Sequence, residues 1–300
     1  MSLASPAEIE LVDGVAEGGG SPWRIVARTF MQSKLAVIGL VVIGLLIVFS
    51  YLGPLVHGTN QIDPNLPVVN TPPSGAFPLG TDQSGFDILG RLMLGGRSSL
   101  EVGFAVGIVS TVLGLVYGAI SGYFGGWIDA LMMRIVDVFL AIPIVLLFIF
   151  MSQAFRPSLL LLILLFTAVS WLVPARLVRG ESLSLRTREY VVAVRSMGGG
   201  AGRIILRHLI PNTIGTIVVT ITFQIGNAIL MLAILQYLGF GLPPTTPTWG
   251  SMLSNGTNYL QDGYWWQVYP ALGLIIITIV AFNFVGDALQ DAFDVRLHER

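Results

Sequence analysis

The sequence holds no cysteine and little charge, and both shortages narrow the classes of protein that it can encode. Without cysteine there are no disulfides, no iron–sulfur clusters and no thiolate zinc sites. Only 11% of the 300 residues are charged, whereas 54% are hydrophobic. A soluble domain of this length needs more charge to cover its surface, so much of this surface is expected to face lipid. The net charge of −1 gives no indication of nucleic-acid binding.

Histidine and lysine are scarce as well. The three histidines, His57, His208 and His298, fall in separate segments, so we expect neither a metal site nor a cofactor in this chain. The one lysine, Lys34, is followed by Leu35 and lacks the glycines of a phosphate-binding loop. If ATP drives this protein, the ATP binds to another chain.

Six apolar stretches are long enough to cross a bilayer, which takes about 20 helical residues, although the fourth and sixth must borrow flanking residues. They lack the alternation of barrel strands, so they are expected to be helices. The predicted fold is an all-α polytopic membrane protein with six transmembrane helices. The predicted spans are Leu35–Val56, Ser98–Gly122, Asp129–Met151, Ser158–Val173, Thr213–Phe240 and Tyr269–Val285.

The basic residues predict the orientation of these spans, because they gather in cytoplasmic loops. The segments on the opposite side hold only Arg91, Arg97 and Arg156. Both termini are therefore expected in the cytoplasm, with residues 1–22 as a disordered tail and no cleavable signal peptide. The basic residues of the three cytoplasmic segments are Arg24, Arg28, Lys34, Arg176, Arg179, Arg186, Arg188, Arg195, Arg203, Arg207, Arg296 and Arg300.

Charged residues inside the apolar runs have two interpretations, because charge in a membrane is expensive and often functional. Asp129, Arg134 and Asp137 lie in the first half of the third span. Arg134 and Asp137 are three residues apart and are expected to pair with each other near the cytoplasmic interface; a proton or substrate relay is the alternative. Pro143 is expected to kink the same helix. At the end of the sixth span, Asp287, Asp291 and Asp294 are expected to be solvated, or to meet a basic partner.

Other patterns concern packing and the outer loops. Ser110, Gly114, Gly118 and Gly122 share one helix face, which can pack within this chain or against a second membrane subunit. The proline-rich loop near residues 57–97 is expected to be an extended connector. The loop from Leu242 to Pro270 is aromatic and predicts either a membrane-interface belt or a docking surface for an external protein. The aromatic residues in it include Trp249, Tyr259, Tyr264, Trp265 and Trp266.

The segment between the fourth and fifth spans has a pattern of its own. Residues 181–197 have helical character, and glycines at 198–200 then break the helix. A second amphipathic segment runs from Arg203 to Ile210, and Pro211 precedes the fifth span. The tendency of arginines to stay in cytoplasmic loops would explain the positive charge of this segment. It would not explain a glycine turn between two amphipathic segments. The pattern predicts a helix, a tight turn and a helix across the cytoplasmic end, offered to a cytoplasmic partner.

This segment resembles the coupling motif of permeases of ABC-type importers, in the form typical of the peptide-transporter branch. Two further stretches are similar to that branch: Pro78-Leu-Gly-Thr-Asp82, which is followed by Phe86 where arginine is common, and Trp249-Gly-Ser-Met-Leu. Residues 28–43 resemble the N-terminal extension of C-type dipeptide and oligopeptide permeases. The coupling motif usually carries an acidic residue at its start, and Glu189 lies about one helical turn before that position. The motif residues that match are Glu189, Tyr190, Ala193, Arg195, Gly198, His208, Pro211 and Asn212.

The resemblance implies a type I ABC importer permease in a bacterial inner membrane, without enzymatic activity of its own. It implies a second homologous permease, two ATPase subunits and an extracytoplasmic peptide-binding protein as partners. The eight residues expected to contact an ATPase subunit include Ala201, next to the glycine turn; the others are Glu189, Tyr190, Ala193, Arg195, Gly198, His208 and Pro211. The implied domains are an N-terminal extension over residues 23–97 and a permease core over 98–300, with a coupling loop at 176–211.

Three alternatives remain open at this stage. The solute could be nickel or another small solute in place of a peptide. An ion-driven secondary transporter would need ionisable residues deep in the bundle, for which Asp137 is the candidate. An intramembrane enzyme would need a catalytic constellation at membrane depth, and none is seen because every histidine lies outside the apolar spans.

Overall fold

The structure is a computed structural model that describes residues 22–154, 158–243 and 246–298. The predicted tail, residues 1–22, lies outside the described residues except for Pro22, at which α2 begins. No strand occurs in these described ranges beyond an isolated bridge between Thr81 and Asp87. The first half of the chain contains α2 (Pro22–Gln32), α3 (Lys34–Tyr51), α4 (Gly53–Val56), η1 (Leu66–Val68), α5 (Ile88–Phe124), α6 (Gly126–Leu140) and α7 (Ile144–Ala154).

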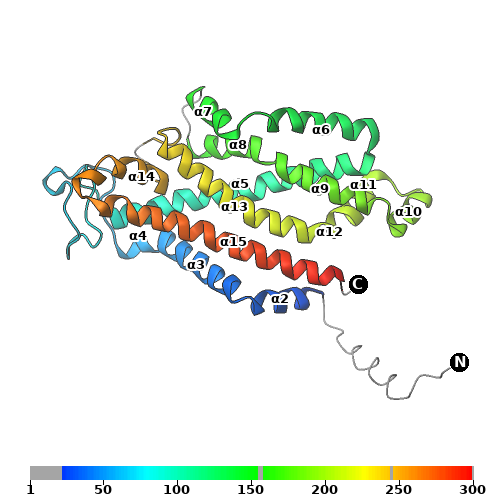
Figure 1. Ribbon diagram of the computed structural model, residues 1–300, viewed down its shortest axis with the longest axis horizontal. Coiled ribbons are helices and arrows are strands. Elements are labelled where there is room, and N and C mark those ends of the chain that lie inside the picture. The colour runs from blue at the N-terminus through cyan, green and yellow to red at the C-terminus, as the bar shows by residue number, and fades with distance from the viewer. Residues whose placement is uncertain (1–21, 155–157, 244–245, 299–300) are drawn as a thin grey trace, which may run out of the picture.

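The second half continues the bundle of helices. It contains α8 (Leu159–Ser170), α9 (Leu172–Leu185), α10 (Glu189–Ser196), α11 (Ala201–Ile204), the π-helical turn η2 (Ile205–Leu209), α12 (Ile210–Asn212), α13 (Ile214–Tyr237), α14 (Trp249–Thr257), η3 (Leu260–Asp262), η4 (Trp265–Gln267) and α15 (Tyr269–His298). The long helices run along one axis (Figure 1). The start of α2, the end of α15, α10 and α11 lie toward one end, here called the loop end, and α14 lies at the other.

Among the described residues, five helices are long and apolar enough to cross a membrane, and a bent pair makes a sixth if it counts as one span. This agrees with the six predicted spans, although several boundaries differ. α5, which corresponds to the second predicted span, begins at Ile88, ten residues before the predicted start, because Asp87 caps it by accepting a hydrogen bond from the Gly90 amide at 2.7 Å. The fourth span extends through α8 and α9 to Leu185.

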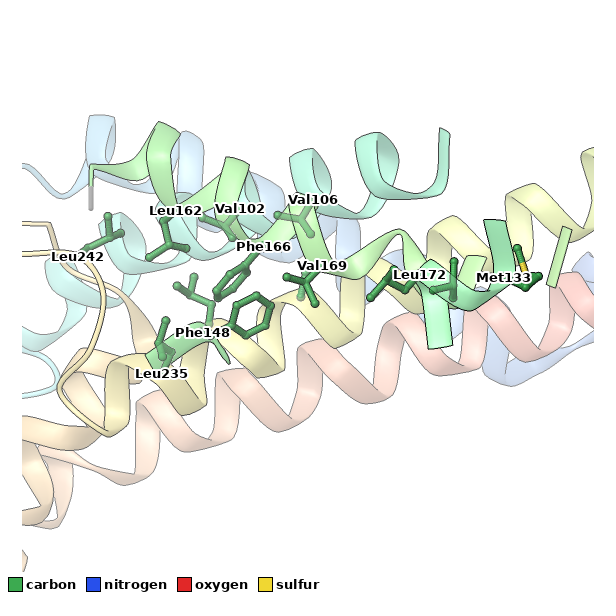
Figure 2. Packing of buried hydrophobic residues seen from close by; sticks show 13 residues of the cluster. Val102, Val106, Met133, Phe148, Leu162, Phe166, Val169, Leu172, Leu235 and Leu242 are labelled. Carbon is green, nitrogen blue, oxygen red and sulfur yellow. The ribbon is translucent and has the colours of Figure 1, made fainter. Parts of the chain in front are cut away.

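The third span is the bent pair. α6 and α7 meet at an angle of 78° across residues 141–143. Pro143 lies in this break, which confirms the predicted kink, since proline cannot donate a hydrogen bond within a helix. Figure 2 shows that α7 packs back onto its neighbours: Phe148 of α7 and Phe166 of α8 lie with ring centroids 4.4 Å apart, beside Leu235 of α13.

A second proline interrupts the fourth span. Pro174 has no N–H, so the carbonyl of Ser170, four residues earlier, loses its helical donor. The side-chain nitrogen of Gln224 on α13 donates to that carbonyl at 2.7 Å. A polar group of one apolar helix therefore satisfies a backbone group of another, as the absence of water in a bilayer requires.

The small-residue face of α5 packs within this chain, against α9. A Cβ at Gly118 would lie 2.4 Å from the Ala175 carbonyl oxygen, and one at Gly122 would lie 2.6 Å from the Ser182 Cβ. Ser110 on the same face is fully buried. Of the two interpretations of this face, the intramolecular one is confirmed, because only small residues let the two backbones approach this closely.

The α14 end differs from the sequence-based expectation. The proline-rich loop is not an extended connector: Thr81, Asp82 and Asp87 in it are buried, and Asp82 forms an ion pair with Arg91 at 3.1 Å. Trp249 and Trp266 are also buried, so for these two residues neither the interface belt nor an external docking surface is correct. The Trp249 indole donates to the Leu92 carbonyl at 2.9 Å, and the Trp266 indole donates to the Thr81 carbonyl at 3.1 Å.

Candidate functional site

The loop between α9 and α13 turns sharply at Gly198. The amide of Gly198 donates to the Arg195 carbonyl at 3.0 Å, and the amide of Gly199 donates to the Val194 carbonyl at 2.9 Å. These two bonds form a Schellman motif, which ends a helix with a residue of positive φ. Gly198 supplies that residue with φ of +82°, a conformation that glycine adopts without steric cost. The predicted glycine break is therefore a defined C-cap of α10.

One face of this loop is buried against the bundle. Val191 of α10, Ile204 of α11 and Leu209 of η2 are fully buried in one cluster. Tyr123, near the end of α5, packs against the same cluster, and Arg195 places its guanidinium 5.1 Å from the centroid of the Tyr123 ring. The amphipathic character predicted for both flanks is thus confirmed, and it fixes the loop on the C-terminal end of α5.

The opposite face of the loop is exposed and partly apolar. Met197 is 79% exposed and Leu206 is 69% exposed, and neither is covered by any other part of the described chain. We call this exposed set the loop surface: Glu189, Tyr190, Val192, Ala193, Arg195, Met197, Gly198 and Leu206. Exposed apolar side chains rimmed by charge are typical of protein–protein contact sites.

Most of the eight predicted contact residues lie on or beside this surface. Glu189, Tyr190, Ala193, Arg195 and Gly198 belong to it, and Pro211 is exposed just beyond η2. Ala201 and His208 are only half exposed. The His208 ring lies 6.2 Å from that of Tyr190, between centroids, and so supports one side of the surface. Glu189 stands in the first turn of α10, where a carboxylate is favourable toward the helix dipole.

Two features of the loop differ from the prediction. The expected helix over residues 181–197 is interrupted at 186–188, where the Thr187 hydroxyl donates to the Ser184 carbonyl at 2.9 Å and Arg186 reaches the Gly122 carbonyl at 3.3 Å. Before Pro211 the chain forms a π-helical turn, because proline removes the amide that would continue the α-helical pattern.

Two ion pairs that the sequence did not predict join α6 to α9, the helix that leads into the loop. Arg179 binds Asp129 with two hydrogen bonds, of 2.5 and 2.6 Å, and the Ser121 hydroxyl also donates to Asp129. Asp137 pairs with Arg176. The predicted pair of Arg134 with Asp137 is therefore wrong, because α9 brings a better placed arginine to Asp137 than α6 does. The available signal was the charge of Asp129 and Asp137 inside the third apolar run and of Arg176 and Arg179 just after the fourth.

No group of three or more His, Asp or Glu residues that could hold a metal ion occurs among residues 22–154, 158–243 and 246–298. The loop surface likewise lacks a nucleophile held by a neighbouring base. The loop surface presents apolar side chains, one carboxylate and one guanidinium, and these groups suit contact with another protein.

Comparison with known proteins agrees with this geometry. Residues 114–299 match the family described as "Binding-protein-dependent transport system inner membrane component". Residues 21–73 match the family described as "N-terminal TM domain of oligopeptide transport permease C". The second match bears out the resemblance of residues 28–43 to C-type permeases.

Several proteins are similar to this chain over nearly its whole length. The oligopeptide transport system permease protein OppC of Bacillus subtilis is 37% identical over 93% of this chain and 91% of its own length. The dipeptide transport system permease protein DppC of the same organism is 36% identical over 90% and 84%. OppC of Haemophilus influenzae is 36% identical over 92% and 89%. The chain therefore belongs to the family of binding-protein-dependent transport system inner-membrane components, and it is a multi-pass membrane protein.

Proposed function

We propose that this chain is one transmembrane subunit of an ATP-driven importer of peptides, and that it forms half of the translocation path. The observation that carries the proposal is the exposed apolar loop surface, rigidly packed on the end of α5, in a chain whose relatives are named as oligopeptide and dipeptide permeases. The complex would also contain a second homologous permease, two ATPase subunits and an extracytoplasmic peptide-binding protein.

The loop end is proposed to face the cytoplasm. Arginines crowd the segment from Arg176 to Arg207, which forms this end together with α2 and the end of α15 (Figure 1). Basic residues are retained in cytoplasmic loops, so their position supports this orientation. The loop surface then lies where an ATPase subunit can reach it.

The proposed mechanism is mechanical. ATP binding closes the pair of ATPase subunits, and the subunit seated on the loop surface moves α10 and α11 with it. Because Val191, Ile204 and Leu209 pack against Tyr123, the movement is passed to α5, and through α9 and its ion pairs to α6. The ATPase contacts differ between the closed and open states, and this difference is what shifts the helices between two arrangements.

A cross-linking experiment tests the contact. The chain has no natural cysteine, so a single introduced thiol is unambiguous. In the assembled complex, Ala201→Cys is expected to cross-link to a cysteine placed in the surface groove of an ATPase subunit. Asn255→Cys, on α14 at the far end, is the control and should give no cross-link. Cross-linking at Asn255 in place of Ala201 would reverse the proposed orientation.

A glycine substitution tests the coupling. Valine at Gly198 must adopt a positive φ, at a cost of at least about 1–2 kcal/mol, so the turn is expected to rearrange. Gly198→Val should reduce ATP-driven peptide uptake while ATP hydrolysis and membrane insertion remain. The matched control is Gly180→Val on α9, where an added Cβ would meet nothing within 4 Å and φ is not positive. Normal uptake by Gly198→Val would contradict the coupling role.

A further inference from the structure

One face of α13 carries polar groups in the middle of an apolar helix. Thr216, Thr220 and Asn227 are spaced by four and seven residues, so they share one side of the helix. Asn227 is exposed, and the two threonines are partly exposed. The helix as a whole is apolar enough to span a membrane, with a mean hydropathy of 2.1. An exposed amide near the middle of such a helix needs an explanation.

The neighbouring helix α15 shows the same arrangement. Asn283 and Gln290 are seven residues apart and exposed, with the exposed Asp287 between them. Toward the α14 end the same face becomes apolar, at Ile276 and Val280, which are also exposed. The polar part of each exposed face therefore runs from the middle of the helix toward the loop end.

A cavity of 310 Å³ joins the two faces. Thr216 and Thr220 of α13, Gln290 of α15 and Glu181 of α9 are among its lining residues. Figure 1 shows α13 running between α9 and α15. The cavity adjoins the loop-end part of both polar faces, at Thr216, Thr220 and Gln290, while Asn227 and Asn283 are not among its lining residues. The volume is at the small end of the range for ligand sites.

Hydrocarbon is a poor environment for this surface. Threonine hydroxyls on these helices donate to the carbonyl four residues earlier: Thr220 to Thr216 at 2.6 Å, Thr222 to Val218 at 3.0 Å, and Thr278 to Leu274. Within the part of the chain that the structure describes, no side-chain hydrogen bond joins Asn227 or Asn283 to another residue. Unpaired amides facing lipid would each cost several kcal/mol, whereas facing water they cost nothing.

We infer that these residues form the water-exposed wall along which the transported solute passes. The polar wall consists of Thr216, Thr220, Asn227, Asn283 and Gln290. The amides and hydroxyls of these residues both donate and accept hydrogen bonds without net charge, and Asp287, between Asn283 and Gln290 on the same face, adds one carboxylate. This chemistry matches the main-chain N–H and C=O groups of a peptide and places no demand on its side chains. The inference rests on the proposed function for the identity of the solute.

Thiol accessibility tests the polar wall in the assembled complex, reconstituted in lipid vesicles. Asn227→Cys and Thr220→Cys are expected to react with a charged, membrane-impermeant methanethiosulfonate reagent. Val41→Cys is the matched control, since Val41 is 55% exposed on the apolar helix α3. A thiol ionises in water and stays neutral and inert in hydrocarbon, so the wall positions should react at least about tenfold faster than the control.

The consequence for transport is measured on the same samples with tetra-alanine as the probe peptide. Labelling Asn227→Cys should block uptake, because the attached group stands in the solute's route. Equal reaction rates at Asn227→Cys and Val41→Cys, or full uptake after complete labelling, would overturn the inference. Failure of the unlabelled complex to take up any peptide would instead contradict the proposed function, because the labelling rates do not depend on the solute.

Discussion

At the α14 end, Trp249 and Trp266 are 1% and 7% exposed, whereas at the loop end Met197 and Leu206 are 79% and 69% exposed. Both ends combine apolar side chains with turns and charged neighbours, and both were candidates for contact with another protein. Trp249 instead joins α14 to α5, and Trp266 joins η4 to the proline-rich loop, each through a buried hydrogen bond. The α14 end is therefore closed by a folded cap, whereas the loop end carries the exposed loop surface.

This comparison predicts that the two ends respond differently to substitution, and the largest loss of stability is expected at Trp249. Trp249→Ala leaves a cavity under the cap and removes the donor to the Leu92 carbonyl, so the free energy of unfolding should fall by about 3–5 kcal/mol. The thermal unfolding of the purified complex measures the loss. Trp265→Ala, at a half-exposed neighbour, is the control and should change stability little.

A smaller loss is expected at Trp266. Trp266→Phe keeps most of the ring but removes the indole donor to the Thr81 carbonyl. Gln267 still donates to that carbonyl at 3.3 Å, so it is not left unpaired, and the loss should be about 0.5–1.5 kcal/mol. Chemical denaturation of this variant beside Trp265→Phe gives the difference. A loss as large as that of Trp249→Ala would mean that the cap depends equally on both tryptophans.

The smallest effect on stability is expected at the loop surface. Met197→Asp changes an exposed side chain, so the free energy of unfolding should move by no more than about 0.5 kcal/mol. Transport in the assembled complex should nevertheless fall, since a charge is placed in the proposed contact with an ATPase subunit. Val191→Asp, on the buried face of the same helix, should instead disrupt the fold of the loop. Unchanged transport in Met197→Asp would remove Met197 from the contact.

Much of the loop was predictable because its signals are local. The glycines after α10, the amphipathic pattern from Arg203 to Ile210, and the position of Pro211 each act within a few residues of chain. The ion pairs of Asp129 with Arg179 and Asp137 with Arg176 were not predictable in the same way. Their members are 50 and 39 residues apart, and only the packing of α6 beside α9 brings them together.

By itself the sequence determined the apolar helices, the breaks at Pro143 and near Gly198, and the membership of the family, because hydropathy, proline geometry and motif spacing are properties of short segments. Only the tertiary structure decided which of the residues that the sequence placed in loops are buried. Trp249 is covered because α14 folds back onto α5, and Asn227 stays uncovered because no described helix lies over its face of α13. Burial depends on contacts between distant segments, and those contacts separate a structural cap from surfaces left for a partner and a solute.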